Sequence, residues 1–357
     1  MPDTIDTVVL AGGGLRGLAL LGALQQQLDA GRLEHVRTYA GTSVGAIIAY
    51  LLVIGFTPIE LFVFFYEPEG VVFFRQVTQV DVSLVWRANG LIDMNVIAEA
   101  LHVLTRRKLD TVPTLQSLHD VFQKDLVSVT FHQTRNRTEM LRRETHGDLS
   151  CIDALCRSAA LPFLFTPVRD ATGLYLDGAI SHNFPVDLVM TLPTVRNVLA
   201  IRTQCAADYR IPGPNVMMTA HNLAMTIVHH QENHSIRTAE ACCMRNSGSG
   251  LCIISVPITS VMVLGFPVNP TESFDLFSCG YQTARECGGR NRTNDEAGKS
   301  CLDPNKSTRI TDGSLPADDP LLGRGHDADA ARKLFHEAPE IHAEENVLLV
   351  VHPVENP

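Results

Sequence analysis

The sequence has little positive charge and no long apolar run. Its 29 Lys and Arg are outnumbered by 39 Asp and Glu, and a formal net charge of −10 argues against a nucleic-acid partner. Residues 38–59 carry no charge, but their unbroken apolar part is only 46–56, whereas a membrane span needs ~20 residues. The charge-free stretch 246–271 is interrupted by prolines and hydroxyl residues, which favours strands. We therefore expect no transmembrane segment.

The cysteines also lack a recognisable arrangement. There are nine, and no two form a C-x-x-C pair, which argues against a zinc ribbon or a thioredoxin-type site and favours free thiols in a reducing compartment. A signal peptide begins with basic residues followed by an apolar run. The N-terminal residues here are acidic, so they do not resemble one. We expect an intracellular protein that is soluble or peripherally membrane-associated.

The pentapeptide Gly41-Thr42-Ser43-Val44-Gly45 has the G-x-S-x-G pattern. An apolar run at 36–40 precedes it and predicts a buried strand, and the apolar run 46–54 behind it predicts a buried helix. Between a strand and a helix this pattern is typical of a nucleophile elbow, in which glycines at 41 and 45 prevent collisions with neighbouring elements. The alternative interpretation is a tight turn whose serine only caps the helix.

A second glycine-rich turn, Gly12-Gly13-Gly14-Leu15-Arg16-Gly17, follows a predicted strand at 7–10. Leucines at three- and four-residue spacing after it predict a helix that Gly31 ends, which completes a right-handed βαβ unit. Binding of a dinucleotide requires an acidic residue at the end of the second strand, and none is present there; a Walker loop requires a Lys after Gly17. Bare backbone N–H groups beside a serine can instead form an oxyanion hole.

Later segments predict further elements. Helices are expected at 95–104, 115–122, 151–160, 215–244 and 274–284, and strands at 126–131, 174–179, 196–202 and 251–256. Residues 163–168 are expected to be extended because prolines flank them. The Phe-rich region 58–90 is either ordinary core or the lining of an acyl-chain site. The strand at 174–179 contains Asp177-Gly178-Ala179, whose carboxylate either points to a site at the sheet edge or belongs to an ordinary turn.

Histidines at 229, 230 and 234 fall on the expected helix 215–244. His230 and His234 are spaced as a metal pair would be, but the zincin pattern requires Glu after the first His, and Gln231 stands there. We therefore expect no metal and no cofactor.

Taken together, the two glycine-rich motifs and Asp177-Gly178-Ala179 resemble the patatin-like phospholipases. The segments 158–162, 165–168 and 183–186 are also similar to the family pattern, and the resemblance extends over roughly 5–285. It implies an α/β fold: a three-layer α/β/α sandwich with a mostly parallel central sheet, a modified relative of the α/β-hydrolase architecture. Residues 286–340 are expected to be disordered or loosely packed, and 341–357 to form a short segment that docks as a strand.

The resemblance also implies a chemistry. Ser43 would be the nucleophile and Asp177 the proton acceptor of a catalytic dyad without histidine. The backbone at Gly13, Gly14, Leu15 and Arg16 would form the oxyanion hole. The remaining motif positions are Gly12, Gly17, Gly41, Gly45, Gly178 and Ala179. The implied activity is that of a lipid acyl hydrolase of the phospholipase A type, acting on a lipid substrate at a membrane or lipid-droplet surface.

Two alternatives remain open at this point. The first is a Ser-His-Asp esterase, in which His221, His229, His230 or His234 supplies the base. The second is a catalytically silent lipid-binding protein that keeps the fold. Head-group preference, ester position and oligomeric state are not predicted.

Overall fold

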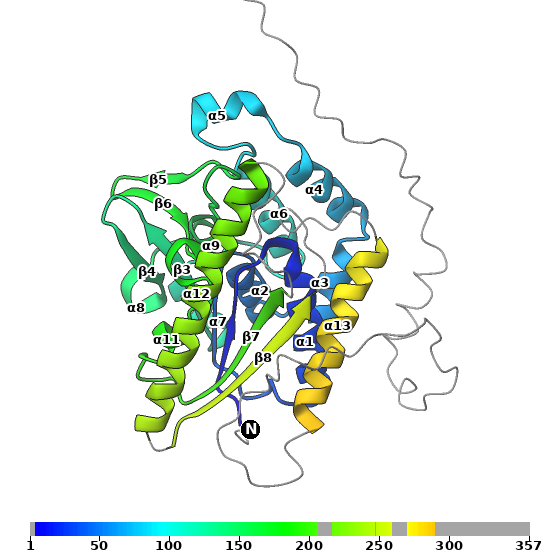
Figure 1. Ribbon diagram of the computed structural model, residues 1–357, viewed down its shortest axis with the longest axis vertical. Helices are drawn as coiled ribbons and strands as arrows, with labels where there is room; N and C mark the ends of the chain where they lie inside the picture. The colour runs from blue at the N-terminus through cyan, green and yellow to red at the C-terminus, as the bar shows by residue number, and fades with distance from the viewer. Residues whose placement is uncertain (1–3, 206–215, 247, 259–269, 290–357) are drawn as a thin grey trace, which may run out of the picture. The chain divides into compact units, whose positions relative to one another are not determined.

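A computed structural model describes residues 4–205, 216–246, 248–258 and 270–289. Its centre is an eight-stranded sheet in the order β5-β6-β3-β2-β1-β7-β8, with β4 also paired to β3 (Figure 1). The strands are β1 (Thr7–Leu10), β2 (Thr38–Thr42), β3 (Asp125–His132), β4 (Arg137–Leu141), β5 (Val168–Asp170), β6 (Gly173–Asp177), β7 (Asn197–Cys205) and β8 (Gly250–Ile258). Strands β3, β2, β1, β7 and β8 are parallel, whereas β4 and β6 run antiparallel to β3.

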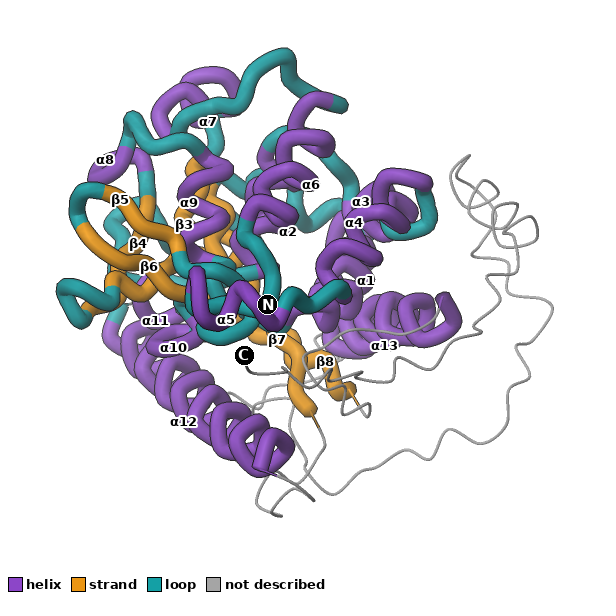
Figure 2. The backbone as a smooth tube through the Cα atoms, turned by 90° about the horizontal axis from the view of Figure 1, so that it is seen from above, coloured by secondary structure: helices purple, strands orange, loops and turns teal. Residues whose placement is uncertain are grey.

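Helices cover both faces of this sheet (Figures 1 and 2). They are α1 (Gly17–Asp29), α2 (Val44–Val53), α3 (Pro58–Phe64), α4 (Pro68–Thr78), α5 (Val82–Ala88), α6 (Asn95–Arg106), α7 (Leu115–Phe122), α8 (Arg143–His146), α9 (Cys151–Ser158), α10 (Ala179–His182), α11 (Val186–Val189), α12 (Val216–Arg245) and α13 (Pro270–Gly289). A short 3₁₀ turn, η1 (Gly14–Arg16), precedes α1. The predicted α/β sandwich with a mostly parallel sheet is confirmed.

The core divides at the sheet because side chains alternate along each strand. Val8 and Leu10 of β1 belong to the large cluster that also contains the apolar faces of α1, α2, α9 and α13. Val9 of the same strand belongs to the smaller cluster, together with Val186 and Val189 of α11 and Ala239 of α12. The central strands are therefore buried on both faces, which explains their continuous apolar sequences.

The predicted βαβ unit is present. Strands β1 and β2 pair in parallel, with Thr7 opposite Thr38 and Leu10 opposite Gly41, and α1 connects them. Both glycine-rich turns consequently leave the sheet at the same carboxyl edge, where α/β proteins place their sites. The second strand begins two positions later than the sequence indicates, at Thr38.

Most predicted elements are confirmed within a few residues, including the helices at 95–106, 115–122 and 151–158. The expected extended conformation at 163–168 is wrong in its first part. Residues 162–164 form a turn, because the Leu161 carbonyl accepts hydrogen bonds from the N–H groups of Leu164 (3.2 Å) and Phe165 (2.9 Å). Phe163 has φ of 68° at this turn, a conformation that its position after a proline does not indicate.

The Phe-rich region forms α3 and α4. Phe62 and Phe64 are buried in the large core cluster, and Phe65 and Phe73 pack against it. The core interpretation therefore holds for these four rings. The expected free thiols are found at Cys151 and Cys156, which are buried on α9.

The last described helix packs closely on the first. α13 lies along α1, and a Cβ atom on Gly22 would come within 1.8 Å of the Phe277 carbonyl oxygen. α13 continues to Gly289, and residues 290–357 lie outside the described part of the chain, so the segments expected at 286–340 and 341–357 stay predictions.

Glycine at position 280 is expected to be essential for this helix pair. A Cβ at Gly280 would meet the Ala19 carbonyl oxygen at 1.9 Å, so Gly280→Ala should force the helices apart and lower stability by about 1–3 kcal/mol. Gly288→Ala in the same helix is the control, because a Cβ there has no atom within 4 Å. Thermal unfolding of both variants measures the difference, and an equal effect at the two positions would contradict the packing argument.

Candidate active site

Ser43 occupies a strained turn between β2 and α2. Its backbone has φ of 56° and ψ of −126°, a region that residues with a side chain rarely adopt. The chain can turn here because glycines stand two positions before and two positions after Ser43. A Cβ on Gly41 would lie 2.5 Å from the Gly45 carbonyl carbon, and one on Gly45 would lie 2.5 Å from the Leu10 carbonyl oxygen. The collisions expected from the sequence are therefore present.

A second serine holds this turn in place. The backbone N–H of Ser43 donates a hydrogen bond to Ser158 Oγ at 2.9 Å, and Ser158 Oγ in turn donates to the Val129 carbonyl at 2.5 Å. Ser158 is fully buried at the end of α9. The turn is thereby tied to β3 through a single hydroxyl group.

Asp177 lies at the end of β6 and is 1% exposed. Burial raises its pKa to about 6, and hydrogen bonds from the Ala179 N–H and the Ser43 side chain partly oppose this rise. The Ala179 N–H contacts Asp177 Oδ1 at 2.8 Å. The structure thus brings together Ser43 and Asp177, which are 134 positions apart in the sequence (177 − 43).

The glycine loop presents backbone donors beside this pair. The N–H groups of Gly13, Gly14 and Leu15 have no acceptor among the described residues, whereas the Arg16 N–H donates to the Gly13 carbonyl at 3.2 Å. Arg16 Nε also donates to the Gly13 carbonyl, at 3.1 Å. The side chain of Arg16 therefore braces the loop, and three backbone N–H groups remain for a ligand.

One short segment joins the three motifs. After Asp177 the chain forms α10, and the carbonyl of His182 accepts a hydrogen bond from Thr42 Oγ1 at 2.7 Å. The next residue, Asn183, accepts a hydrogen bond at its carbonyl from the Gly12 N–H at 2.9 Å. Residues 177–183 consequently contact the serine turn, the carboxylate and the glycine loop.

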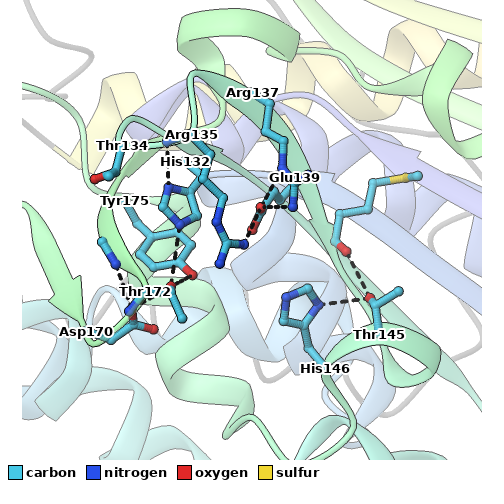
Figure 3. Close-up of polar contacts among 12 residues, drawn as sticks. His132, Thr134, Arg135, Arg137, Glu139, Thr145, His146, Asp170, Thr172 and Tyr175 are labelled. Atoms are coloured by element: carbon cyan, nitrogen blue, oxygen red, sulfur yellow. Dashed lines mark hydrogen bonds and ion pairs between the residues drawn. The ribbon is translucent and has the colours of Figure 1, made fainter.

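The opposite end of β6 is fixed by a polar cluster (Figure 3). The buried ring of His132 packs against Tyr175, with ring centroids 4.4 Å apart, and the guanidinium of Arg157 lies over the Tyr175 ring, 4.3 Å from its centroid. Arg157 also pairs with Asp170 at 2.9 Å. These contacts fix Tyr175 on β6, and Asp177 lies two residues after Tyr175 on the same strand.

The sequence motifs do not include Glu232 and Arg202, which are buried and linked to the glycine loop through Asn183. Arg202 lies on β7 and Glu232 on α12, and they form an ion pair at 3.0 Å. The only sequence signal is a charged residue inside each apolar pattern. Ser158 and Asn183 lie in segments that the sequence resemblance already includes.

The histidines considered as alternative bases lie on α12. His229, His230 and His234 are exposed, and none of these three forms a hydrogen bond with Ser43, while the side chain of His221 lies outside the described residues. Within the described ranges no group of three or more His, Cys, Asp and Glu residues could hold a metal ion.

No single helix among the described residues has the length and apolar character needed to cross a membrane. Only α2 and α3 taken together reach the required composition, and they are bent by 119° at the break between them.

Several known proteins are similar to this chain over part of its length. A family model described as patatin-like phospholipase matches residues 8–190. The probable lipid hydrolase 463L of Invertebrate iridescent virus 6 is 28% identical over 204 residues, which are 55% of this chain and 67% of that protein. Uncharacterized protein YqhO of Bacillus subtilis is 25% identical over 291 residues, covering 76% of this chain and 94% of that protein. Among solved structures, VipD from Legionella pneumophila aligns with a TM-score of 0.47 and 17% identity, over 81% of this chain and 67% of that chain.

The burial of Asp177 predicts a pH-dependent loss of stability. The pKa of Asp177 rises from the ordinary 3.8 to about 6 on folding, so the folded protein binds the proton of this carboxyl group more tightly than the unfolded chain does. The resulting destabilisation is absent below about pH 4, appears between pH 4 and 6, and reaches roughly 3 kcal/mol above pH 6. Asp177→Asn, which keeps an acceptor for the Ala179 N–H, should therefore raise the melting temperature at pH 8 but not at pH 4.

Thermal unfolding across this pH range measures the effect, with Asn substitution of the exposed Asp148 as control. A variant at 177 that is less stable than wild type at pH 8 would show that the ionised carboxylate is not destabilising.

Proposed function

Because the chain belongs to the patatin-like phospholipase family, whose model covers residues 8–190, we propose that it is a lipid acyl hydrolase of the phospholipase A type. It cleaves fatty acyl esters through a Ser43–Asp177 dyad. The proposal rests on the strained turn at Ser43 and on the buried carboxylate of Asp177, whose pKa is raised to about 6 by burial and partly lowered by the Ser43 side chain. A carboxylate with a raised pKa is a better base for a serine hydroxyl.

In the first step, Ser43 Oγ attacks the ester carbonyl carbon while Asp177 takes the hydroxyl proton. The carbonyl oxygen then carries a negative charge, which the N–H groups of Gly13, Gly14 and Leu15 stabilise. Each well-aimed donor of this kind contributes about 3–4 kcal/mol to the transition state. When the tetrahedral intermediate collapses, the ester C–O bond breaks, and the proton on Asp177 passes to the departing alcohol.

In the second step, water releases the fatty acid. Asp177 removes a proton from the water, whose oxygen attacks the acyl carbon, and the same N–H groups stabilise the new oxyanion. Collapse breaks the bond to Ser43 Oγ, which recovers its proton from Asp177. The two protein side chains suffice for this sequence.

The dyad predicts the outcome of a hydrolysis assay. Wild-type protein should release fatty acid from phospholipid vesicles in excess chelator, Ser43→Ala should release none, and Asp177→Asn should be about 10²–10⁴-fold slower because the general base is lost. The wild-type kcat/KM should rise with pH through a midpoint near 6, as Asp177 loses its proton.

Full activity of a folded Asp177→Asn protein would contradict the dyad. Absence of activity on vesicles and on a p-nitrophenyl ester would favour a silent lipid-binding protein. Loss of activity on replacing a single histidine of α12 would favour the Ser-His-Asp mechanism instead.

We further propose that a lipid surface meets the protein at the edge of the sheet where α5 lies. This helix has no buried residue, and Val82, Val85 and Trp86 on one of its faces are 59%, 38% and 88% exposed. A pocket of about 480 Å³ opens between α4, α5 and the start of α6. Figure 1 places α5 beyond the ends toward which β7 and β8 point, which is the edge that also carries Ser43. An exposed Trp on an apolar helix face is typical of contact with a bilayer interface.

A second aromatic side chain extends this surface. Phe163 is 83% exposed, and its neighbour Leu164 accepts hydrogen bonds at its carbonyl from the N–H groups of Leu91 (2.9 Å) and Ile92 (2.8 Å), just after α5. The same loop begins at Ala160, whose carbonyl accepts the Asp177 N–H at 2.9 Å. The segments that carry the two exposed aromatics are therefore joined by hydrogen bonds, and the loop of Phe163 begins at a residue bonded to the Asp177 backbone.

Replacing these aromatics should separate surface binding from chemistry. Trp86→Ala combined with Phe163→Ala should lower the rate on phospholipid vesicles about tenfold or more, because each aromatic contributes roughly 1.5–3 kcal/mol of apolar burial. Hydrolysis of a soluble p-nitrophenyl ester should stay within about twofold of wild type. Met244→Ala is the control: Met244 is 83% exposed at the far end of α12.

Vesicle sedimentation measures binding directly. Equal rates of the double variant and wild type on vesicles would contradict a lipid-docking role for α5. If gel filtration shows that the double variant has a different oligomeric state from wild type, this face would be assigned to self-association.

A further inference from the structure

The glycine loop is held from behind by a chain of buried polar side chains. Asn183, Glu232 and Arg202 are 5%, 6% and 1% exposed, and they come from three separate segments. We propose that these three residues act as one positioning device for the oxyanion loop. The inference rests on the proposed acyl hydrolase function.

The first contact in this chain is between Asn183 and Gly12. The Gly12 N–H donates to the Asn183 carbonyl at 2.9 Å, and Asn183 Nδ2 lies 3.4 Å from the Gly12 carbonyl oxygen as a donor. A Cβ at Gly12 would come within 2.4 Å of Asn183 Oδ1. The side chain of Asn183 therefore packs directly against the residue that begins the loop.

Glu232 fixes the orientation of that amide. Its Oε1 accepts a hydrogen bond from Asn183 Nδ2 at 2.6 Å, so the amide nitrogen must point toward the carboxylate. Its Oε2 accepts from Arg202 Nη1 at 3.0 Å, and Arg202 Nε donates to Ser255 Oγ at 3.0 Å. The carboxylate is thereby held on both oxygens, one by the amide and one by the guanidinium.

A buried ion pair is weak evidence for a role in stability, because apolar residues of similar volume often stabilise a core as well or better. This pair instead fixes the orientation of the Asn183 side chain, because Arg202 holds the Glu232 carboxylate that accepts from Asn183. Asn183 in turn fixes the position of Gly12. The three free N–H donors, at Gly13, Gly14 and Leu15, follow immediately in the chain. A shift of Gly12 therefore moves all three donors relative to Ser43.

This arrangement predicts a specific kinetic effect. Oxyanion donors act in the transition state, so their misplacement lowers kcat and leaves KM nearly unchanged. Within the described part of the chain neither Glu232 nor Arg202 forms a hydrogen bond or ion pair with Asp177, so the pH midpoint of activity should also stay where it is in wild type. A residue that only supported the fold would lower the melting temperature without this pattern.

The experiment compares Glu232→Gln with wild type on a soluble p-nitrophenyl ester, well below both melting temperatures. Gln keeps an acceptor for Asn183 but loses the charge that holds Arg202. We expect kcat to fall about 10–100-fold, with KM within about twofold and an unchanged pH midpoint. Asp125→Asn is the control: Asp125 pairs with Arg143 at 3.0 Å, but it lies at the start of β3, away from the carboxyl edge of the sheet. Its kcat should equal that of wild type.

A double-mutant cycle tests whether Glu232 acts through Asn183. Asn183→Ala should lower kcat by at least as much as Glu232→Gln, and the double variant should be no slower than Asn183→Ala alone. Multiplicative losses, or an unchanged kcat in folded Glu232→Gln, would overturn the positioning role. Glu232→Gln leaves the buried cation of Arg202 unpaired, and this variant could therefore fail to fold. In that case the variant that combines Arg202→Met with Glu232→Gln replaces Glu232→Gln in the cycle.

The wild-type protein distinguishes the two levels of the proposal. An absence of ester hydrolysis by wild type would contradict the proposed function, and the positioning role with it. Normal wild-type turnover together with additive variants would overturn the positioning role alone.

Discussion

The site depends on how closely α2 approaches β1 and β2 at the serine turn. Gly45 lies so near the Leu10 carbonyl oxygen that a Cβ there would be at 2.5 Å, and Gly41 is equally close to the first turn of α2. This approach forces Ser43 into its positive-φ conformation and directs the start of α2 at the space beside the glycine loop. If either glycine is lost, the strand, the helix and the loop can no longer keep their present spacing.

The candidate base is formed at the expense of stability. Asp177 would be easier to accommodate as a neutral residue, because burial raises its pKa to about 6. Neutral groups, not charged ones, hold the carboxylate in position. Asp177 interacts with the Ala179 N–H and the Ser43 side chain, and its strand is held by the packing of the His132 and Tyr175 rings. Among the described residues no cation pairs with the carboxylate, so no neighbouring positive charge lowers its pKa.

Local patterns in the sequence are sufficient to predict the central strands, the helices that follow them and the two glycine-rich turns, since each depends on periodicity or on a residue type with a clear steric role. The Arg202–Glu232 pair is not predictable in this way, because its meaning depends on contacts between residues 30 positions apart and with Asn183, 49 positions from Glu232. The hydrogen bonds that the Leu164 carbonyl accepts from Leu91 and Ile92, just after α5, are likewise tertiary contacts that local preference does not indicate.

The central claim is that Ser43 becomes acylated during turnover. The most direct measurement is intact mass spectrometry after rapid acid quench of the protein with a p-nitrophenyl ester, followed by peptide mapping. The account predicts one added acyl group, located on Ser43, absent in Ser43→Ala and formed more slowly in Asp177→Asn. Ester hydrolysis by wild type without an adduct on Ser43, or with the acyl group on another residue, would contradict it.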